Sequence, residues 1–228
     1  MSKRVIAVIP ARIDSSRFPA KMIADQSGKP LIQYAWEVAM NASSVNEVYI
    51  ATDSQEIANS VYEFGGEIIL TGEHPNGTSR IAEAVRDMDC DVVVNMQGDE
   101  PELDPNVIDA TVAVLADSVM ATAACTLRGD EVSNENVVKV QVADGYSVDF
   151  TRDTQNEGAL RHIGLYVYKP TFLQTYVELQ PTQNEIARKL EQMRVIDNGF
   201  KIAVAIVNPQ PGGIDTLEQY EAFVSRVL

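Results

Sequence analysis

Residues 92–101 read VVVNMQGDEP, an apolar run that passes directly into polar residues and a pair of carboxylates. The valines are typical of a buried β-strand. In an open α/β sheet, ligands bind beyond the carboxyl ends of the strands, and Asp99 and Glu100 follow this strand at once. The stretch therefore predicts a sheet strand that ends at a polar site.

Outward from this stretch, strand-like and helix-like segments alternate through the first half of the chain. Expected strands cover residues 5–9, 47–52, 67–70 and 91–96. Expected helices cover residues 30–40, 79–88 and 104–116, together with a helix that opens at a capping box over residues 53–56 and runs to residue 64. Such alternation predicts an α/β fold with a mostly parallel sheet flanked by helices.

The second half is less regular. Its expected strands cover residues 120–127, 137–142, 164–168 and 202–207, and its expected helices cover residues 171–179, 185–199 and 216–227. A second capping box spans residues 182–185. The sequence contains no internal repeat, low-complexity tract or Gly/Ser linker. We therefore expect a single domain over residues 1–228, in which the later strands extend or flank the sheet.

Composition narrows the classes of partner. The chain has 228 residues, is 45% hydrophobic and carries a formal net charge of −15. Nucleic acids and anionic membranes bind basic surfaces, so neither is expected as a partner. No stretch approaches the roughly 18 apolar residues of a membrane span, and the apolar run near the start is too short for a signal peptide. A cytoplasmic protein is the expectation.

Cysteine usage agrees with that location. Cys90 and Cys125 are the only cysteines, and no CxxC or Cys/His spacing is present. A zinc site is therefore not expected. We expect both cysteines to be free thiols in a reducing compartment.

A basic loop, IPARIDSSRFPAK at residues 9–21, follows the first expected strand. It holds Arg12, Arg17 and Lys21, with Ser15 and Ser16 between them, in a chain otherwise short of positive charge. Three cations and several backbone N–H groups in one loop suit a polyphosphate. The loop lacks the GxxxxGK[ST] pattern of a Walker A motif, and the alternative is an ordinary basic loop.

The QGDEP segment is the second polar loop at a strand end. Mg²⁺ is bound by few carboxylates and shares phosphate oxygens, so Asp99 opposite a phosphate-binding loop suits that ion. The alternative is that Asp99 and Glu100 cap the next helix, but Asp104 and Pro105 already supply its N-cap and first-turn proline. The residues alone predict a nucleotide and magnesium, and no more.

Nine segments of the sequence carry a resemblance to a known family. They are IPARIDSSRFPAK, GKPLIQYAWEVA, VYIATD, NGTSRIAEAV, VVNMQGDEP, NVVKV, RHIGLYVY, KLEQMRVIDNG and GIDTLEQYE. In these segments and their order the chain resembles the 3-deoxy-manno-octulosonate cytidylyltransferases, or CMP-Kdo synthetases, from end to end.

The resemblance implies an activity and a fold. These enzymes join CTP to the anomeric hydroxyl of 3-deoxy-manno-octulosonate (Kdo), release pyrophosphate and give CMP-Kdo for lipopolysaccharide synthesis. They have a nucleotide-sugar-transferase α/β fold, which is Rossmann-like, use Mg²⁺ and are usually homodimers. We therefore expect CTP and a Kdo-like 2-keto sugar acid as substrates, and a homodimer.

The resemblance also implies roles for individual residues. The implied catalytic residues are Arg12, Lys21 and Asp99, and the implied magnesium ligands are Asp99 and Asp215. The implied nucleotide contacts are Pro10, Ala11, Arg12, Arg17, Lys21, Asn76, Gly77, Arg80 and Gln97. The implied contacts to the sugar acid are Gln97, His162, Tyr166, Glu191 and Gln192.

Several of these residues have structural alternatives. Asp215 precedes Thr-Leu-Glu and so fits a capping box, but Thr216 can cap the helix with Gln219 three residues on, which leaves Asp215 free. His162 and Tyr166 alternate with apolar neighbours, a pattern that also suits packing positions on a strand. Glu191 and Gln192 also suit a helix surface.

Three departures from the family pattern fall on the sugar side. The segment DTQNEGALR, residues 153–161, is shorter than the family's excursion before His162, which bears on the dimer contact and the sugar pocket. Asp149 stands where the family has Tyr, and Asp153 follows Arg152. Residues 182–185, TQNE, replace a Ser-Pro-Leu-Glu pattern. The acidic changes suit an amino-substituted octulosonate, or they are surface drift.

Two other functions remain open at this point. One is the same cytidylyl transfer to an 8-amino-Kdo or another nonulosonate-type acid. The other, from a different class, is a non-catalytic nucleotide-binding protein that keeps the fold.

Overall fold

One mixed β-sheet runs through the whole protein. The computed structural model describes residues 3–15, 17–154 and 158–228. Within them the sheet has nine strands in the order β3-β2-β1-β4-β8-β5-β9-β7-β6. The strands are β1 Val5–Ala11, β2 Glu47–Thr52, β3 Glu67–Leu70, β4 Val92–Asn95, β5 Met120–Cys125, β6 Lys139–Ala143, β7 Tyr146–Thr151, β8 Leu160–Tyr168 and β9 Ile202–Val207. This architecture confirms the expected α/β class, and within it the later strands extend the same sheet.

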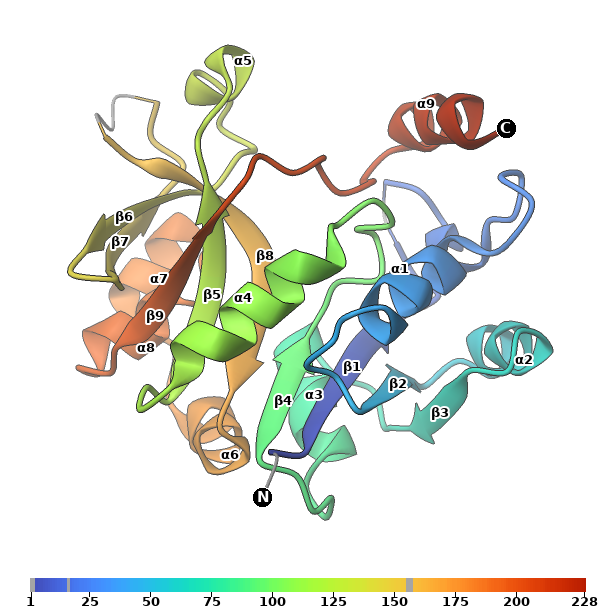
Figure 1. Cartoon of the computed structure of the whole chain (residues 1–228), viewed down its shortest axis with the longest axis horizontal. Coiled ribbons are helices and arrows are strands. Elements are labelled where there is room, and N and C mark those ends of the chain that lie inside the picture. The colour runs from blue at the N-terminus through green and yellow to red at the C-terminus, as the bar shows by residue number, and fades with distance from the viewer. Residues whose placement is uncertain (1–2, 16, 155–157) are drawn as a thin grey trace.

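Helices cover both faces of the sheet, with α1 and α4 in front of it and α3 and α6 behind it in Figure 1. The helices are α1 Leu31–Met40, α2 Gln55–Glu63, α3 Gly77–Ala84, α4 Pro105–Leu115, α5 Gly129–Val132, α6 Pro170–Glu178, α7 Gln183–Arg188, α8 Met193–Asp197 and α9 Leu217–Val227, with a 3₁₀ turn, η1, at Lys21–Ile23. One core layer contains buried side chains of α1, α2 and α4, and the other contains those of α3, α6 and α8. None of the helices in the described part of the chain has the length and apolar character needed to cross a membrane.

Strand direction changes in the middle of the sheet. β1 pairs in parallel with β2 and β4, and β2 with β3, as expected from the alternating pattern. β8 then lies between β4 and β5 and is antiparallel to both. β5 and β9 are parallel again, while β6 and β7 form an antiparallel hairpin. The expected parallel arrangement therefore holds for the first four strands and for the β5–β9 pair.

Two helix predictions need correction. Ser54, not Asp53, is the N-cap of α2, and its side chain accepts from the backbone N–H of Ile57 at 3.3 Å. The single helix expected over residues 185–199 is two short helices, because Lys189 adopts a left-handed conformation at φ 55° and ends α7. This break places Glu191 and Gln192 between α7 and α8.

Three other cap predictions are confirmed. Asp104 caps α4, with Pro105 in the first turn, and Thr182 and Thr216 form capping boxes with Glu185 and Gln219. Asp99, Glu100 and Asp215 are therefore not needed as helix caps, and their carboxylates face other groups.

Candidate active site

The basic loop turns back on itself so that Lys21 points inward. Ala20 has a left-handed backbone, and the 3₁₀ turn that follows it buries the Lys21 side chain to 6% exposure. The Lys21 ammonium donates to Asp99 Oδ2 at 2.6 Å and to the carbonyl oxygen of Ile214 at 2.7 Å. Ser16, which belonged to the predicted phosphate loop, lies outside the described residues. The loop thus brings a buried cation against the acidic end of β4.

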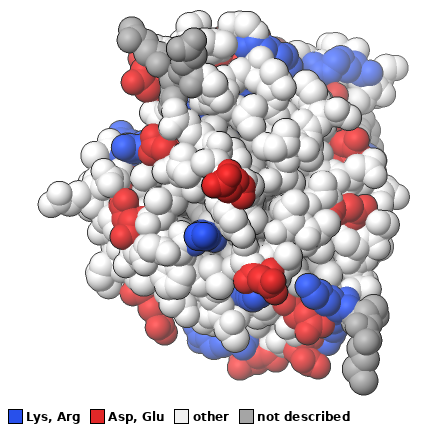
Figure 2. Space-filling model, turned by 60° about the vertical axis from the view of Figure 1, so that its left-hand side comes forward, with Lys and Arg blue, Asp and Glu red and all other residues white. Residues whose placement is uncertain are grey.

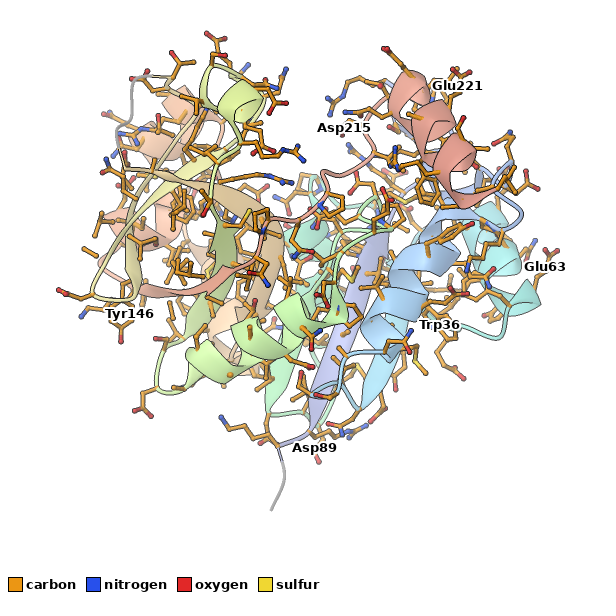
Figure 3. All side chains as sticks on the ribbon, turned by 45° about the horizontal axis from the view of Figure 1, so that its top comes forward. Trp36, Glu63, Asp89, Tyr146, Asp215 and Glu221 are labelled. Atoms are coloured by element: carbon orange, nitrogen blue, oxygen red, sulfur yellow. The ribbon has the colours of Figure 1, made fainter. Side chains whose placement is uncertain are left out.

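Asp215 comes from the other end of the chain. It lies on the segment between β9 and α9, where Figure 3 labels it. The backbone N–H of Ile214 donates to the carbonyl oxygen of Asp99 at 2.8 Å. Asp215 Oδ1 accepts from Arg17 at 2.8 Å and lies 3.9 Å from the Lys21 ammonium. The two predicted metal ligands therefore face the same lysine.

A cavity of about 310 Å³ opens beside these groups. Its lining contains all nine predicted nucleotide residues and both predicted metal ligands, together with other residues. The lining residues are Pro10, Ala11, Arg12, Ser15, Arg17, Lys21, Met22, His74, Pro75, Asn76, Gly77, Arg80, Gln97, Asp99 and Asp215. The structure thus brings together, at the carboxyl ends of β1 and β4, residues that are far apart in the sequence.

One end of this cavity is formed by the start of α3. Asn76 is the N-cap, and its side-chain oxygen accepts from the N–H and hydroxyl of Ser79 at 2.8 and 2.7 Å. Gly77 approaches Pro10 so closely that an added Cβ would lie 3.0 Å from the proline Cγ. This packing leaves backbone, and no side chain, facing the cavity at Gly77.

Arg80 is held rigidly at the same end. It is only 4% exposed, and its guanidinium donates to Asp53 Oδ2 at 2.9 Å and to Thr71 Oγ1 at 2.7 Å. Asp53, which sequence reasoning took for a helix cap, is the group that fixes Arg80. The Arg80 side chain therefore lines the cavity with its charge already paired.

Of the five residues predicted for the sugar side, Gln97 lines the cavity, and the other four form a separate group next to it. His162 Nε2 lies 2.9 Å from Thr122 Oγ1, and the ring centroids of His162 and Tyr166 are 5.4 Å apart. Glu191 accepts from Thr78 Oγ1 at 3.2 Å, directly beyond Gly77 in α3. Gln192 is buried. His162, Tyr166, Glu191 and Gln192 are absent from the cavity lining, so this group adjoins the cavity from the β8 and α8 side.

Burial sets the protonation of this group. It lowers the pKa of His162 to about 3, with the Arg161 and Arg152 charges adding to the effect, so the imidazole is neutral. The Thr122 hydroxyl donates to the carbonyl oxygen of Leu165 at 2.8 Å, which leaves it to accept from the His162 Nε2–H. Burial likewise raises the pKa of Tyr166 far above its usual value. A neutral imidazole and phenol orient hydroxyl groups by hydrogen bonding.

Glu100, the second carboxylate of QGDEP, has a different environment from Asp99. Burial raises its pKa to about 7, with the Asp99 charge adding to the rise and Arg161 opposing it. An added Cβ at Gly164 would lie 3.4 Å from Glu100 Oε1. Glu100 therefore lies between the acidic loop and β8.

Arg161 is a structural residue of the site that sequence reasoning missed. Its guanidinium donates to the carbonyl oxygens of Gln210 and Pro211 at 2.6 and 2.8 Å and lies 3.3 Å from Glu131 Oε1. These bonds fix the segment that carries Ile214 and Asp215. The sequence signal for Arg161 is its position directly before His162, as the first residue of the RHIGLYVY motif.

A second cavity, of about 580 Å³, shares Arg17 and Asp215 with the first. Its other lining residues are Glu135, Asn136, Arg152, Asp153 and Lys189. Sequence reasoning did not place Arg152 or Lys189 at the site, and the split of the expected helix at Lys189 is what brings that side chain to the cavity. The two cavities together form one polar site with the Arg17–Asp215 pair between them.

Asp149, one of the residues that depart from the family pattern on the sugar side, has a partner within the protein. Asp149 forms an ion pair with Arg188 of α7. Residues 155–157 of the shortened segment lie outside the described residues. The Asp149 carboxylate is thus engaged within the protein and is not presented to a ligand.

The donor set at Lys21 suits a hard divalent cation. Asp99 Oδ2, Asp215 Oδ1 and the Ile214 carbonyl oxygen surround one point, and Mg²⁺ is commonly held by one or two carboxylates with water and phosphate oxygens completing the shell. Among the described residues, no group of three or more His, Cys, Asp or Glu side chains could form an all-protein metal cage. The residues present therefore fit an ion that shares its ligands with a phosphate.

Comparisons with known proteins agree with this geometry. A family model described as cytidylyltransferase matches residues 6–202. The chain is 37% identical to a 3-deoxy-manno-octulosonate cytidylyltransferase of Geotalea uraniireducens, over 98% of this chain and 99% of that one. It is also 37% identical to an 8-amino-3,8-dideoxy-manno-octulosonate cytidylyltransferase of Shewanella pealeana, over 98% of each chain.

A solved structure of a related enzyme has the same fold. The chain superimposes on a CMP:2-keto-3-deoxy-manno-octonic acid synthetase complexed with CTP, with a TM-score of 0.92 and 32% identity. The match covers 99% of this chain and 100% of that one.

Proposed function

The chain belongs to the 3-deoxy-manno-octulosonate cytidylyltransferase family and is a nucleotidyltransferase, and we propose that it makes CMP-Kdo from CTP and Kdo with Mg²⁺. The single observation that carries this proposal is the cavity whose lining combines Arg12, Arg17 and Lys21 with the carboxylates of Asp99 and Asp215. A triphosphate and a divalent ion are the ligands that such a pairing suits.

The CTP end of the proposal rests on the cavity lining. Arg12 and Arg17 supply positive charge for the triphosphate, and Asn76 and Gly77 at the start of α3 face the nucleoside end together with Pro10. A helix N-terminus presents free backbone N–H groups, which donate to acceptor atoms of a bound nucleotide. Pro10, Ala11, Arg80 and Gln97 complete the proposed nucleotide contacts.

The proposed metal is Mg²⁺, held by Asp99 and Asp215. When bound, the ion supplies charge neutralisation at the phosphate oxygens. The chain's own contribution is the fixed position of both carboxylates, which Arg161 and the Ile214–Asp99 backbone bond maintain.

The reaction is an in-line displacement at phosphorus. The anomeric oxygen of the sugar acid forms a bond to the α-phosphorus, the bond from that phosphorus to the bridging oxygen of the β-phosphate breaks, and the sugar hydroxyl proton passes to solvent. Pyrophosphate leaves with the electron pair. Little covalent work falls to the protein, so catalysis depends on positioning and on charge stabilisation by Arg12 and Lys21.

The sugar acid is proposed to lie against Gln97, His162, Tyr166, Glu191 and Gln192. Neutral His162 and Tyr166 offer directed hydrogen bonds, and Glu191 accepts from hydroxyl groups as it does from Thr78. Glu191 is largely buried, which raises its pKa, with the Thr78 bond opposing that rise.

An 8-amino-Kdo is the second candidate acceptor, because a relative named for that substrate is as similar as one named for Kdo. Asp149, one of the two acidic residues that suit an ammonium, weighs against it because it is already paired with Arg188. Kdo is therefore the preferred acceptor in our proposal.

Pyrophosphate release decides between these acceptors. The purified protein is supplied with Mg²⁺, with CTP or UTP, and with Kdo, 8-amino-Kdo or a nonulosonate as the acid. We expect turnover with CTP and Kdo at least tenfold above that with the other pairs. Faster turnover with 8-amino-Kdo would transfer the proposal to that acid, and no turnover with any acid would refute it.

We also propose that the enzyme is a cytoplasmic homodimer that serves lipopolysaccharide synthesis. Figure 2 shows a face, on the side of α7, α8, β6 and β7, on which wide uncharged areas surround acidic and basic groups near the middle. Large apolar side chains are exposed on nearby elements, namely Val132, Val148, Ile186 and Ile206. Such surfaces favour association between copies. Sedimentation velocity should give a dimer of the 25.0 kDa chain, and a monomer at micromolar concentration would contradict this.

A further inference from the structure

The Lys21 ammonium occupies the centre of the proposed metal site. It lies 2.6 Å from Asp99 Oδ2, 2.7 Å from the Ile214 carbonyl oxygen and 3.9 Å from Asp215 Oδ1. Its side chain is only 6% exposed, whereas those of Asp99 and Asp215 are 24% and 47% exposed. Lys21 therefore reaches these oxygens from the protein side, beneath the mouth of the cavity.

A divalent ion held by the same two aspartates would need Asp99 Oδ2, which the ammonium contacts at 2.6 Å, and Asp215 Oδ1, which Arg17 contacts at 2.8 Å with the ammonium 3.9 Å away. Mg²⁺ binds oxygen at about 2.0–2.1 Å and demands near-octahedral geometry. An ammonium 2.6 Å from Asp99 Oδ2 fills the space around that oxygen, and two cations so close repel each other strongly in a partly buried site. The lysine and the metal cannot both occupy this point.

We propose that Lys21 is a resident counter-cation, which holds the metal's place in the nucleotide-free enzyme and is displaced when the metal binds. The inference rests on the proposed function for the identity of the metal site. The ammonium stabilises Asp99 and Asp215 against their mutual repulsion, with Glu100 adding a third acidic group nearby.

The cavity beside Asp99 can accommodate the displaced Lys21 ammonium. Lys21 lines the same cavity as Arg12 and Arg17, and its flexible four-carbon stem allows the ammonium to turn from Asp99 into the cavity. An anionic triphosphate in that cavity would receive it. Metal and triphosphate binding are then coupled, because the phosphate takes up the cation that the metal expels.

The proposed displacement predicts a measurable change in the apparent affinity for a divalent ion. If Lys21 fills the site more than about nine-tenths of the time, the apparent affinity of the free protein for a divalent ion is reduced at least about tenfold. Removal of the ammonium should restore that affinity. Methionine is an unbranched, neutral replacement of similar length, so Lys21→Met is the variant of choice.

The experiment measures Mn²⁺ binding to nucleotide-free protein by electron paramagnetic resonance of the free ion. Lys21→Met should bind Mn²⁺ at least about tenfold more tightly than the wild type. Lys21→Arg keeps a cation in place and should stay within about threefold of the wild type. Arg12→Met, which removes a charge from the same cavity without an ion pair among the described residues, should also stay within threefold.

Three results would overturn the inference. Equal Mn²⁺ affinity in the wild type and Lys21→Met shows that the lysine does not hold the metal's place. An equal gain in Lys21→Met and Arg12→Met shows a general effect of charge. No Mn²⁺ binding by a folded Lys21→Met refutes the metal site itself, whereas cytidylyl transfer by the wild type is tested separately by pyrophosphate release.

A measurement on the wild type covers the case in which Lys21→Met does not fold. In ¹⁵N-labelled protein, a buried, hydrogen-bonded ammonium exchanges its protons slowly enough to give its own resonance. Saturating Mg²⁺ without nucleotide should shift or abolish the Lys21 resonance. A resonance unchanged by Mg²⁺ at a concentration that saturates the protein would refute displacement.

Discussion

The backbone N–H of Ile214 donates to the carbonyl oxygen of Asp99 at 2.8 Å. This bond ties the loop after β4 to the segment before α9, so the carboxylates of Asp99 and Asp215 are positioned by main chain and not by side-chain packing alone. Substitutions of the carboxylates should therefore change the chemistry of the site while leaving its frame in place.

Asp215→Asn should lower turnover by about a hundredfold, the scale seen when one principal electrostatic stabiliser is lost. The Asp215 side chain is 47% exposed and Thr216 caps α9, so the melting temperature should change little. Steady-state kinetics over a range of Mg²⁺ concentrations measure the effect. Asp14→Asn, an exposed carboxylate of the basic loop that does not line the cavity, is the matched control and should keep near-native activity.

Asp99→Asn should reduce turnover to a similar degree and also lower stability. It leaves the buried Lys21 ammonium without its closest carboxylate, and breaking a buried ion pair is costly. A variant that retains native turnover at limiting Mg²⁺ would show that Asp99 is not a metal ligand.

Lys21→Ala should reduce kcat more than it raises KM for CTP. Negative charge accumulates on the leaving pyrophosphate, and a contact that strengthens in the transition state lowers kcat when it is removed. Lys21→Arg should restore activity only in part, because a planar guanidinium replaces a compact ammonium. Arg12→Ala should resemble Lys21→Ala.

The control for these cationic variants is Lys201→Ala. Lys201 lies over the ring of Tyr146, 4.8 Å from its centroid, away from both cavities, and its loss should leave the kinetics unchanged. Steady-state kinetics against CTP, at saturating Mg²⁺ and Kdo, distinguish a loss of kcat from a rise in KM for each variant. A Lys21→Ala enzyme with raised KM and unchanged kcat would make Lys21 a binding anchor only.

Gly77→Ala should raise KM for CTP about tenfold. Its new Cβ would lie 3.0 Å from Pro10 Cγ, and the rigid proline ring lines the nucleotide end of the cavity, so relief must come from backbone movement there. Alanine also favours the helix at this position, so stability should not fall for want of helix propensity. Gly129→Ala, whose Cβ meets nothing within 4 Å, is the control, and equal KM values for the two variants would contradict close packing at Pro10.

His162 should contribute a loss of stability as the pH falls. Its folded pKa is about 3 against an unfolded value near 6.5, so between these limits the unfolded state binds a proton that the folded state does not. Stability therefore falls with decreasing pH, by up to about 1.4 kcal/mol per unit for this group. Urea unfolding of the wild type and His162→Gln at pH 7, 6, 5 and 4 measures it. The stability difference between them should shift in favour of the variant below pH 6, and a constant difference would show that His162 is not buried in its neutral form.

The elements that sequence reasoning placed well are those with local signals. Thr182 and Thr216 begin helices because each has a partner three residues on, and Asp104 is followed by a proline. The acidic loop and the basic loop were also placed correctly at strand ends. Each follows a short apolar run that forms a strand, so the end of the run marks the carboxyl end of that strand.

Other features depend on contacts that no local pattern contains. Asp53 fitted a capping box, but Ser54 caps α2 and Asp53 pairs with Arg80 from α3. The β6–β7 hairpin was missed although Asp144 and Gly145, both with positive φ, form the two-residue turn that such hairpins prefer. That signal was readable in the sequence.

The position of Lys21 could not have been predicted from residues 9–21. Its ammonium is bound by groups that lie 78 and 193 positions further along the chain. A basic loop beside an acidic one suggested a phosphate and a metal as separate ligands. Only the fold shows that the lysine and the two aspartates share one point.

The place of β8 in the sheet also determines the order in which the protein can be assembled during synthesis. β4 and β5 emerge from the ribosome well before residues 160–168, yet each pairs with β8 and not with the other. Until that strand arrives, both keep an unpaired edge of buried-type residues, which is a template for aggregation. A nascent chain halted after β6 should therefore aggregate or recruit chaperones, whereas one extended past β9, which pairs with the other edge of β5, should be soluble to a far greater degree.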